Sequence, residues 1–223
     1  MAVNAPEIWV FGDYRNYFQN RVTLQLLSRA TDLAGKPGAT VCATVFGHGT
    51  AEWAGEYIAH GAKKIYRVED EALGHYSSDL FVALMERLAS QYGPEIILVG
   101  ATSFGREFAP RVAKRLGTGL TADCVGLDIN EEGLLVQTAP AFGGNLLTRI
   151  VTPERKPQMA TVRPGVFHEI PHDYHATGDI VRIGMPVDLP GDRIRLIASE
   201  HRPPAAQKLG DAEVVVCGGR GMG

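Results

Sequence analysis

Apolar residues in the first half of the chain follow two spacings, short continuous runs and runs that recur every three or four positions. "EIWVFG" (7–12) is a short apolar run that ends at glycine, which is typical of a buried strand. In the next segment Val22, Leu26 and Leu33 share one face of a helical pattern that closes at Gly35. We therefore expect a strand followed by an amphipathic helix.

The same alternation continues to residue 117. Further strands are expected at 39–47, 63–70 and 94–102, and helices at 50–61, 77–93 and 103–117. A helix between each pair of strands is the crossover that parallel pairing requires, and continuous apolar strands indicate a sheet covered on both faces. The pattern predicts a doubly wound, Rossmann-like α/β domain with a mostly parallel sheet.

Two residues in these helices carry specific expectations. Thr50 is suited to cap the helix that follows it. Pro110 lies within the helix at 103–117 and lacks an amide donor, so we expect it to bend that helix or delay its regular start.

The pattern of apolar and polar residues changes after about residue 120. Short β-branched runs with glycine or proline between them predict an added β-rich section. "HRPPAAQKLG" (201–210) has the composition of a linker, and "AEVVVCGG" beyond it has that of a new strand. We expect an α/β domain over 1–198, a hinge at 199–210, and at 211–223 the first strand and turn of an incomplete second α/β domain.

Charge and composition exclude some functions. The net charge of −3 gives no attraction to nucleic acid, no apolar stretch is long enough to span a membrane, and no export signal precedes the first strand, so we expect a cytoplasmic protein. Cys42, Cys124 and Cys217 lie far apart and are interpreted as buried, reduced thiols. His172 and His175 have a metal-like spacing without a third ligand, so no metal site is predicted.

Several turns could bind a ligand. The turn from Thr102 to Gly105 joins a strand end to a helix N-terminus and could hold an anion; the alternative is a simple turn capped by Thr102 or Ser103. Two glycine-bearing loops, 117–124 and 140–150, add single polar residues. The candidates there are Thr121, Asp123, Gly143, Gly144, Asn145 and Arg149, with Arg163 beyond them. A hairpin turn at the two glycines and a solvated basic face are the plain alternatives. No combination of residues typical of a catalytic site appears in the sequence. We therefore expect these residues to bind a ligand rather than to catalyse a reaction.

The C-terminal "VVVCGGRGMG" combines an apolar run with glycines. Gly218, Gly219 and Gly221 leave room for a phosphate or a ring, and Arg220 adds a charge. The spacing is not that of a dinucleotide-binding fingerprint, and a glycine-rich terminus without a ligand is the alternative.

The sequence resembles the alpha subunits of electron transfer flavoproteins in three segments. They are "GATSFGREFAPRVAKRLGTGLTADC", "APAFGGNLLTRIVTPERKPQMATVRPGVF" and "DAEVVVCGGRGMG". The middle part is most similar to subunits of the anaerobic, electron-bifurcating type.

The resemblance implies an N-terminal domain related to adenine-nucleotide hydrolase folds and a C-terminal domain that holds FAD. Gly218, Gly219, Arg220 and Gly221 would open that second domain, whose other flavin contacts fall in segments absent from this sequence. Without them the terminal strand has no sheet to join and should neither fold nor hold flavin by itself.

It also implies a heterodimer with a beta subunit. The loops at 117–124 and 140–150 and the arginines at 149 and 163 are expected to face that partner or a flavin. The protein would be an electron carrier rather than an enzyme, taking electrons from an acyl-CoA or other dehydrogenase, or from NADH. Its acceptor would be a quinone reductase, a ferredoxin or a flavodoxin. The alternative function is a stand-alone ATP- or AMP-binding module similar to universal stress proteins.

Overall fold

The computed structural model describes residues 5–189, 196–198, 200, 212 and 214–222, apart from the side chains of Tyr17 and Phe18. The chain divides into two units, residues 1–193 and 194–223, which we describe separately. The first unit contains all of the described strands and α-helices. The strands are β1 (Glu7–Phe11), β2 (Thr40–Gly47), β3 (Lys64–Glu69), β4 (Ile96–Gly100), β5 (Leu120–Cys124), β6 (Gly126–Ile129), β7 (Leu135–Ala141), β8 (Leu146–Ile150), β9 (Gln158–Val162) and β10 (Asp179–Ile183).

A seven-stranded sheet in the order β10-β3-β2-β1-β4-β9-β5 forms the centre of this unit, and each pairing in it is parallel. Four helices connect its strands and cover it. They are α1 (Tyr17–Ala34), α2 (Ala51–Ala59), α3 (Ser78–Tyr92) and α4 (Ser103–Leu116). The expected doubly wound, mostly parallel α/β fold is confirmed.

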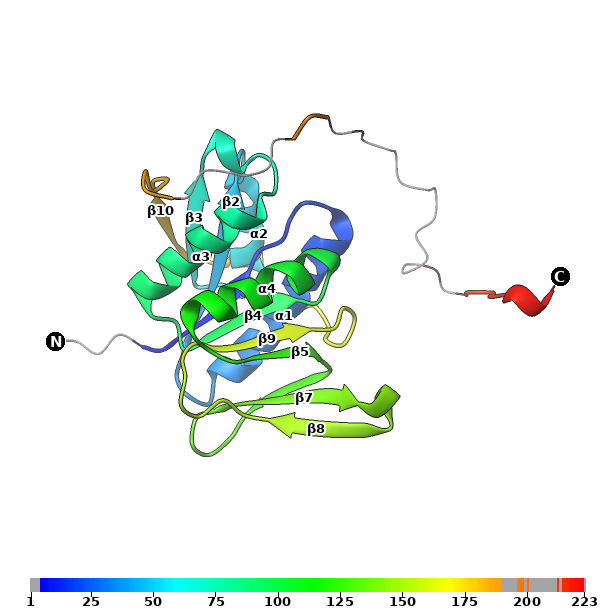
Figure 1. Ribbon diagram of the computed structural model, residues 1–223. Helices are drawn as coiled ribbons and strands as arrows, with labels where there is room; N and C mark the ends of the chain where they lie inside the picture. The colour runs from blue at the N-terminus through cyan, green and yellow to red at the C-terminus, as the bar shows by residue number, and fades with distance from the viewer. Residues whose placement is uncertain (1–4, 190–195, 199, 201–211, 213, 223) are drawn as a thin grey trace. The chain divides into compact units, whose positions relative to one another are not determined.

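The helices lie on both faces of the sheet, with α3 and α4 on the face toward the viewer in Figure 1. Successive residues of β1 point to opposite faces, so Ile8 and Val10 join the core under α1 and α2, whereas Trp9 and Phe11 join the core under α3 and α4. Full burial of these side chains explains why the strand reads as a continuous apolar run rather than an alternating one.

The region after residue 120 contributes to both sheets. β5 and β9 extend the main sheet beyond β4, and β10 closes its other edge against β3. Only β6, β7 and β8 form the separate section, a three-stranded antiparallel sheet. The β-rich section expected from the sequence is therefore smaller than the whole region.

Helix termini follow the local sequence, with one correction. The side chains of Asn16, Ser77 and Thr102 cap α1, α3 and α4 by accepting backbone N–H groups. Thr50 occupies the N-cap position of α2, but the expected capping bond is absent because its hydroxyl accepts from Arg67 Nε at 3.1 Å. Pro110 lies inside α4, which already begins at Ser103, so the start of the helix is not delayed.

In the second unit the strand expected in "AEVVVCGG" (212–219) is not formed among the residues described. Residues 215–219 have no regular structure and are followed by a 3₁₀ turn, η4 (Arg220–Met222). Val214 and Val216 are 80% and 94% exposed, and within the described residues of the second unit no strand pairs with them. Cys217 is exposed, contrary to expectation, whereas Cys42 and Cys124 are buried. The domain boundaries at 198 and 210 stay predictions, and 199–210 lies outside the described residues except for residue 200.

Candidate functional site

The carboxyl ends of β1 and β4 form the point at which the strand order reverses, where open α/β sheets usually bind ligands. Here side chains fill that position. Val22 of α1 packs over Gly100 so closely that a Cβ there would lie 2.6 Å from Val22 Cγ1, and Phe104 stacks on Phe11 at 5.2 Å between ring centroids. The crevice has no space for a nucleotide.

The turn between β4 and α4 is explained by packing. Gly105 lies against the backbone carbonyl of Gly100, where any side chain would collide. Thr102 Oγ1 accepts the Gly105 N–H at 3.1 Å, and the Thr102 carbonyl accepts from Arg106 N. The Gly105 amide, one of the donors that could have held an anion, is thus occupied, which favours the simple capped turn over an ATP- or AMP-binding turn.

A bulge at the end of β5 presents Asp123 at the carboxyl edge of the sheet. The register with β9 shifts between Thr121 and Cys124, and Asp123 takes a positive φ of 57°. Aspartate tolerates this left-handed conformation better than most residues. Its amide donates to Thr161 Oγ1 at 2.9 Å, which fixes the bulge to the neighbouring strand.

Two arginines approach the Asp123 carboxylate. Arg163, just after β9, pairs with it at 2.6 Å, and Arg106, in the first turns of α4, lies at 3.8 Å. The hydrogen bonds from Arg163 hold the pKa of Asp123 below its usual value, with Arg106 adding a smaller effect in the same direction. Sequence reasoning grouped Asp123 with Arg163 but did not single out Arg106.

The other predicted residues lie apart from this cluster. Thr121 is on β5 with its side chain buried. Gly143 and Gly144 have positive φ values in the turn between β7 and β8, so the hairpin that was the alternative to a ligand-binding loop is formed, and Asn145 follows them. Arg149 is exposed on β8, in register with Thr138. Gly218 to Gly221 lie in the second unit.

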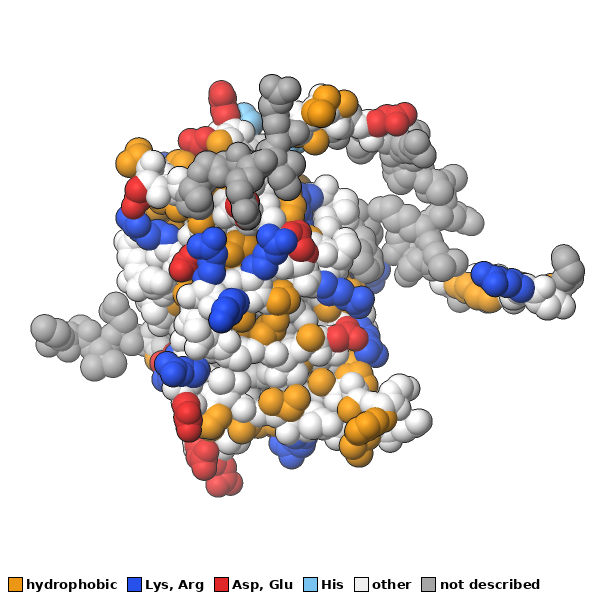
Figure 2. All heavy atoms as spheres, in the orientation of Figure 1, with side chains coloured by type: hydrophobic (Ala, Val, Ile, Leu, Met, Phe, Trp, Pro, Cys, Tyr) orange, Lys and Arg blue, Asp and Glu red, His pale blue; other side chains and the backbone are white. Residues whose placement is uncertain are grey.

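The β7–β8 hairpin exposes a set of apolar side chains that sequence reasoning missed. Phe142 is 83% exposed, Leu147 60% and Leu146 52%, and Ile150 and Val151 lie beside them. Figure 2 shows apolar side chains gathered at the end of this hairpin. β8 is also an edge strand, since only β7 pairs with it in the described part of the chain. The signal was available in "NLLTRIV", where apolar residues do not alternate as they would on a half-buried strand.

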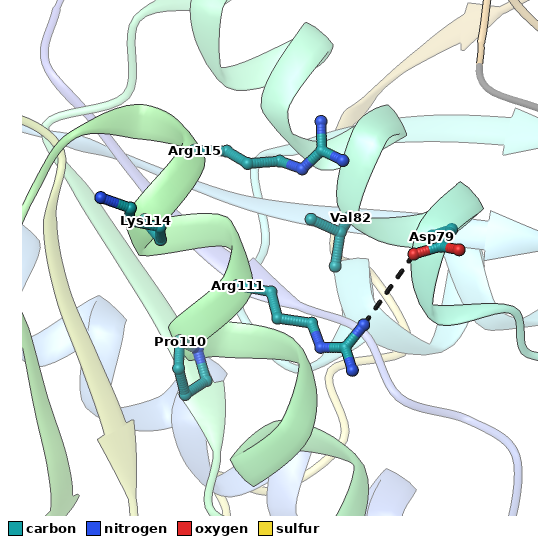
Figure 3. A pocket seen from close by; sticks show the side chains of 6 residues that line it. All are labelled: Asp79, Val82, Pro110, Arg111, Lys114 and Arg115. Atoms are coloured by element: carbon teal, nitrogen blue, oxygen red, sulfur yellow. Dashed lines mark ion pairs between the residues drawn. The ribbon is translucent and has the colours of Figure 1, made fainter.

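A groove between α3 and α4 is lined by the side chains labelled in Figure 3: Asp79, Val82, Pro110, Arg111, Lys114 and Arg115. Its arginines already face carboxylates. Arg111 lies 3.9 Å from Asp79 and 3.3 Å from Glu107, and Arg115 lies 2.9 Å from Glu86. The groove is therefore close to neutral and provides no strong anion site.

A second hollow, of about 490 Å³, lies at the opposite, amino edge of the sheet. Burial alone would raise the pKa of Glu7 there, but hydrogen bonds from Lys64, Trp9 and Tyr66 lower it overall. These donors saturate the carboxylate, so the cluster supports the fold rather than a ligand.

The described ranges lack two other classes of site. No helix there combines the length and apolarity needed to cross a membrane. No group of three His, Cys, Asp or Glu side chains in the same residues is arranged to hold a metal ion. His172 is exposed in a loop, with the rings of His60 and Tyr174 at centroid distances of 5.4 and 4.3 Å.

Comparison with known proteins adds the family. Residues 8–186 match the model of the electron transfer flavoprotein domain. The chain is 40% identical over 217 residues to the electron transfer flavoprotein subunit alpha of Thermoanaerobacterium thermosaccharolyticum, and 39% identical over 219 residues to that of Clostridium acetobutylicum. Each alignment covers 97% of this chain but only 66% and 65% of the relative.

A third relative is the lactate dehydrogenase (NAD(+),ferredoxin) subunit LctC of Acetobacterium woodii, 34% identical over 220 residues, of which 51% is covered. The chain thus spans less than two thirds of the length of the relatives it matches. The parallel sheet with its added antiparallel section, the match over 8–186 and the similarity to alpha subunits together show that this chain belongs to the electron transfer flavoprotein family.

Proposed function

We propose that this chain serves in an electron transfer flavoprotein alpha subunit, where its first unit docks on a beta subunit through the β7–β8 hairpin. The observation that carries this proposal is the combination of exposed Phe142, Leu146 and Leu147 with the open edge of β8. An open edge offers backbone groups to another strand, and apolar side chains on the same hairpin lose exposure when a partner covers them.

In this proposal the complex carries electrons and makes no bond itself. FAD would supply the redox chemistry, and the protein would position it. Electrons would come from an acyl-CoA or other dehydrogenase, or from NADH, and leave to a quinone reductase, a ferredoxin or a flavodoxin. The name of the Acetobacterium relative, which includes both NAD(+) and ferredoxin, supports a bifurcating variant.

Gly218, Gly219, Arg220 and Gly221 are proposed to contribute to flavin binding only as part of a larger folded domain. Their support is the absence of regular structure at 215–219, which leaves no preformed site. Gly143, Gly144, Asn145 and Arg149 are proposed as partner contacts because they belong to the hairpin. Thr121 is proposed to support the bulge, because it is buried on β5 where the shift in register begins. A cytoplasmic location fits the two buried, unpaired thiols at Cys42 and Cys124.

Co-purification with a beta subunit tests the docking. Co-expression of this chain with an electron transfer flavoprotein beta subunit should yield a complex, and Leu147→Glu should abolish it by placing a charge in the apolar interface. Val187→Glu is the matched control, since Val187 is fully exposed on a segment away from the hairpin. The docking proposal is wrong if Leu147→Glu and wild type co-purify equally.

Flavin retention tests the redox part. A chimera that continues this chain with the remaining C-terminal segment of the Thermoanaerobacterium relative, co-expressed with the beta subunit, should purify with flavin absorbance. Retention of tightly bound ATP or AMP by a colourless chimera would instead favour the stand-alone nucleotide-binding function.

A further inference from the structure

We propose that Arg106 and Arg163 form a clamp for a pyrophosphate-bearing ligand, with Asp123 as an internal carboxylate that competes with it. The identity of that ligand as a dinucleotide rests on the proposed function. The clamp itself rests on the charges and distances at the carboxyl edge of β5 and β9.

The charges in the cluster do not balance. Two guanidinium groups face a single carboxylate, which leaves one positive charge in excess. Arg163 Nη2 lies 2.6 Å from Asp123 Oδ2, whereas Arg106 lies 3.8 Å from Oδ1, beyond hydrogen-bond distance. One carboxylate therefore satisfies one guanidinium and leaves the other available.

Both arginines are anchored at strand ends. Arg106 Nε donates to the Ala101 carbonyl at 3.1 Å, and the backbone N–H of Arg163 donates to the Cys124 carbonyl at 3.0 Å. The bulge holds Asp123 between them through its bond to Thr161. Binding an anion here would order few additional side chains, which lowers the entropy cost.

The cluster is open to solvent. The side chains of Arg106, Arg163 and Asp123 are 65%, 44% and 35% exposed. It also lies at the carboxyl edge of a parallel sheet, the edge at which such folds bind their ligands. The crevice between β1 and β4 is filled, so the next strands along this edge offer the accessible position.

The number of acceptor oxygens favours phosphate over carboxylate. A planar guanidinium group donates two parallel N–H bonds to a pair of oxygens, so each of the two arginines needs its own pair. A pyrophosphate has enough oxygens to satisfy both guanidinium groups, whereas a second carboxylate offers only two oxygens. The ligand class is therefore a pyrophosphate or a molecule that contains one.

Titration calorimetry with inorganic pyrophosphate at low salt tests the clamp on the full chain. Asp123→Asn should tighten binding about fivefold or more, because it removes the competing charge and keeps a side chain that accepts positive φ. Arg106→Gln and Arg163→Gln should each weaken binding at least as much. Arg182→Gln, an exposed arginine on β10 at the other edge of the sheet, should leave it unchanged.

The direction of the Asp123→Asn effect decides the result. Weaker or unchanged binding in that variant overturns the competitor role, and absence of binding in every variant overturns the clamp. Thermal unfolding of each variant separates loss of binding from loss of fold. Repetition with inorganic phosphate, ADP and FAD identifies the preferred source of the phosphate groups. Because no beta subunit is present, failure here is distinct from failure of the proposed docking.

Discussion

The side chain of Gln158 in β9 accepts a 2.8 Å hydrogen bond from the backbone N–H of Leu135 in β7. This bond joins the parallel sheet to the antiparallel one, and both residues are buried. On the same strand as Leu135, the amide of Gln137 is fully buried and neither its Nε2 nor its Oε1 has a partner among the described residues. The two glutamines should therefore respond to substitution in opposite ways.

Replacement of each glutamine by methionine measures this difference. Gln158→Met should lower the free energy of unfolding by about 1–3 kcal/mol, because it leaves the Leu135 amide buried without an acceptor. Gln137→Met should be neutral or stabilise by up to about 2 kcal/mol, since it removes two unsatisfied polar atoms. Chemical denaturation checks both variants. If Gln158→Met and Gln137→Met destabilised the protein equally, the proposed difference between the hydrogen-bonded and the unsatisfied glutamine would be wrong.

Glycine positions in the helices provide a second contrast. Gly105→Ala should destabilise the protein by roughly 3 kcal/mol, because the new methyl group collides with the Gly100 carbonyl. Gly55 lies in α2 with open space around its Cα, so Gly55→Ala should stabilise by about 0.5–1 kcal/mol. An unchanged or raised denaturation midpoint of Gly105→Ala would show that the contact at Gly105 is unimportant.

Acid should weaken the fold through Glu7. Its pKa is lowered in the folded protein from an ordinary value of 4.5, so its contribution is complete above that pH and is lost as the pH falls through the lowered pKa. Glu7→Gln should cost about 2 kcal/mol at pH 7, where the carboxylate accepts from Lys64 and Tyr66.

The pH dependence of this cost is the measurement. Unfolding titrations at neutral and strongly acidic pH should show a large difference between wild type and Glu7→Gln at pH 7 that narrows in acid. A difference independent of pH would mean that the charge of Glu7 contributes nothing.

Thiol reactivity should separate the three cysteines. Burial raises the pKa of Cys124 to about 12 and also raises that of Cys42, so neither forms the reactive thiolate at neutral pH. Cys217 is exposed. A thiol reagent should label Cys217 alone in the folded chain and all three cysteines after denaturation, as mass spectrometry of the labelled peptides would show. Rapid labelling of Cys42 or Cys124 under native conditions would contradict the burial.

Local pattern predicted the elements of the main sheet better than their arrangement. The alternation of apolar runs and helical faces up to residue 117 predicted β1 to β4 and α1 to α4. The sheet to which β5 and β9 belong depends on pairing between distant segments, such as Ile96 with Gln158, and no local spacing encodes it.

The candidate site was predictable only in part. Asp123 and Arg163 were both candidates from the sequence. Their contact depends on a β-bulge at Asp123, and no glycine at that position indicates a bulge in the sequence. Arg106 has the sequence context of any charged residue in the first turns of a helix, so only the folded geometry connects it with Asp123. The hairpin turn was one of two interpretations of the glycine pair, and Gly143 and Gly144 adopt the positive φ that such a turn requires.

Strand β10 has a consequence for synthesis of the protein on the ribosome. It pairs with β3, which is translated far earlier, and it completes one border of the central sheet only after the other described strands have emerged. The growing polypeptide therefore presents the unpaired side of β3 to solvent or to a chaperone while residues 70–178 are synthesised. Arrested translation before residue 179 should produce a nascent chain that is prone to self-association through that side.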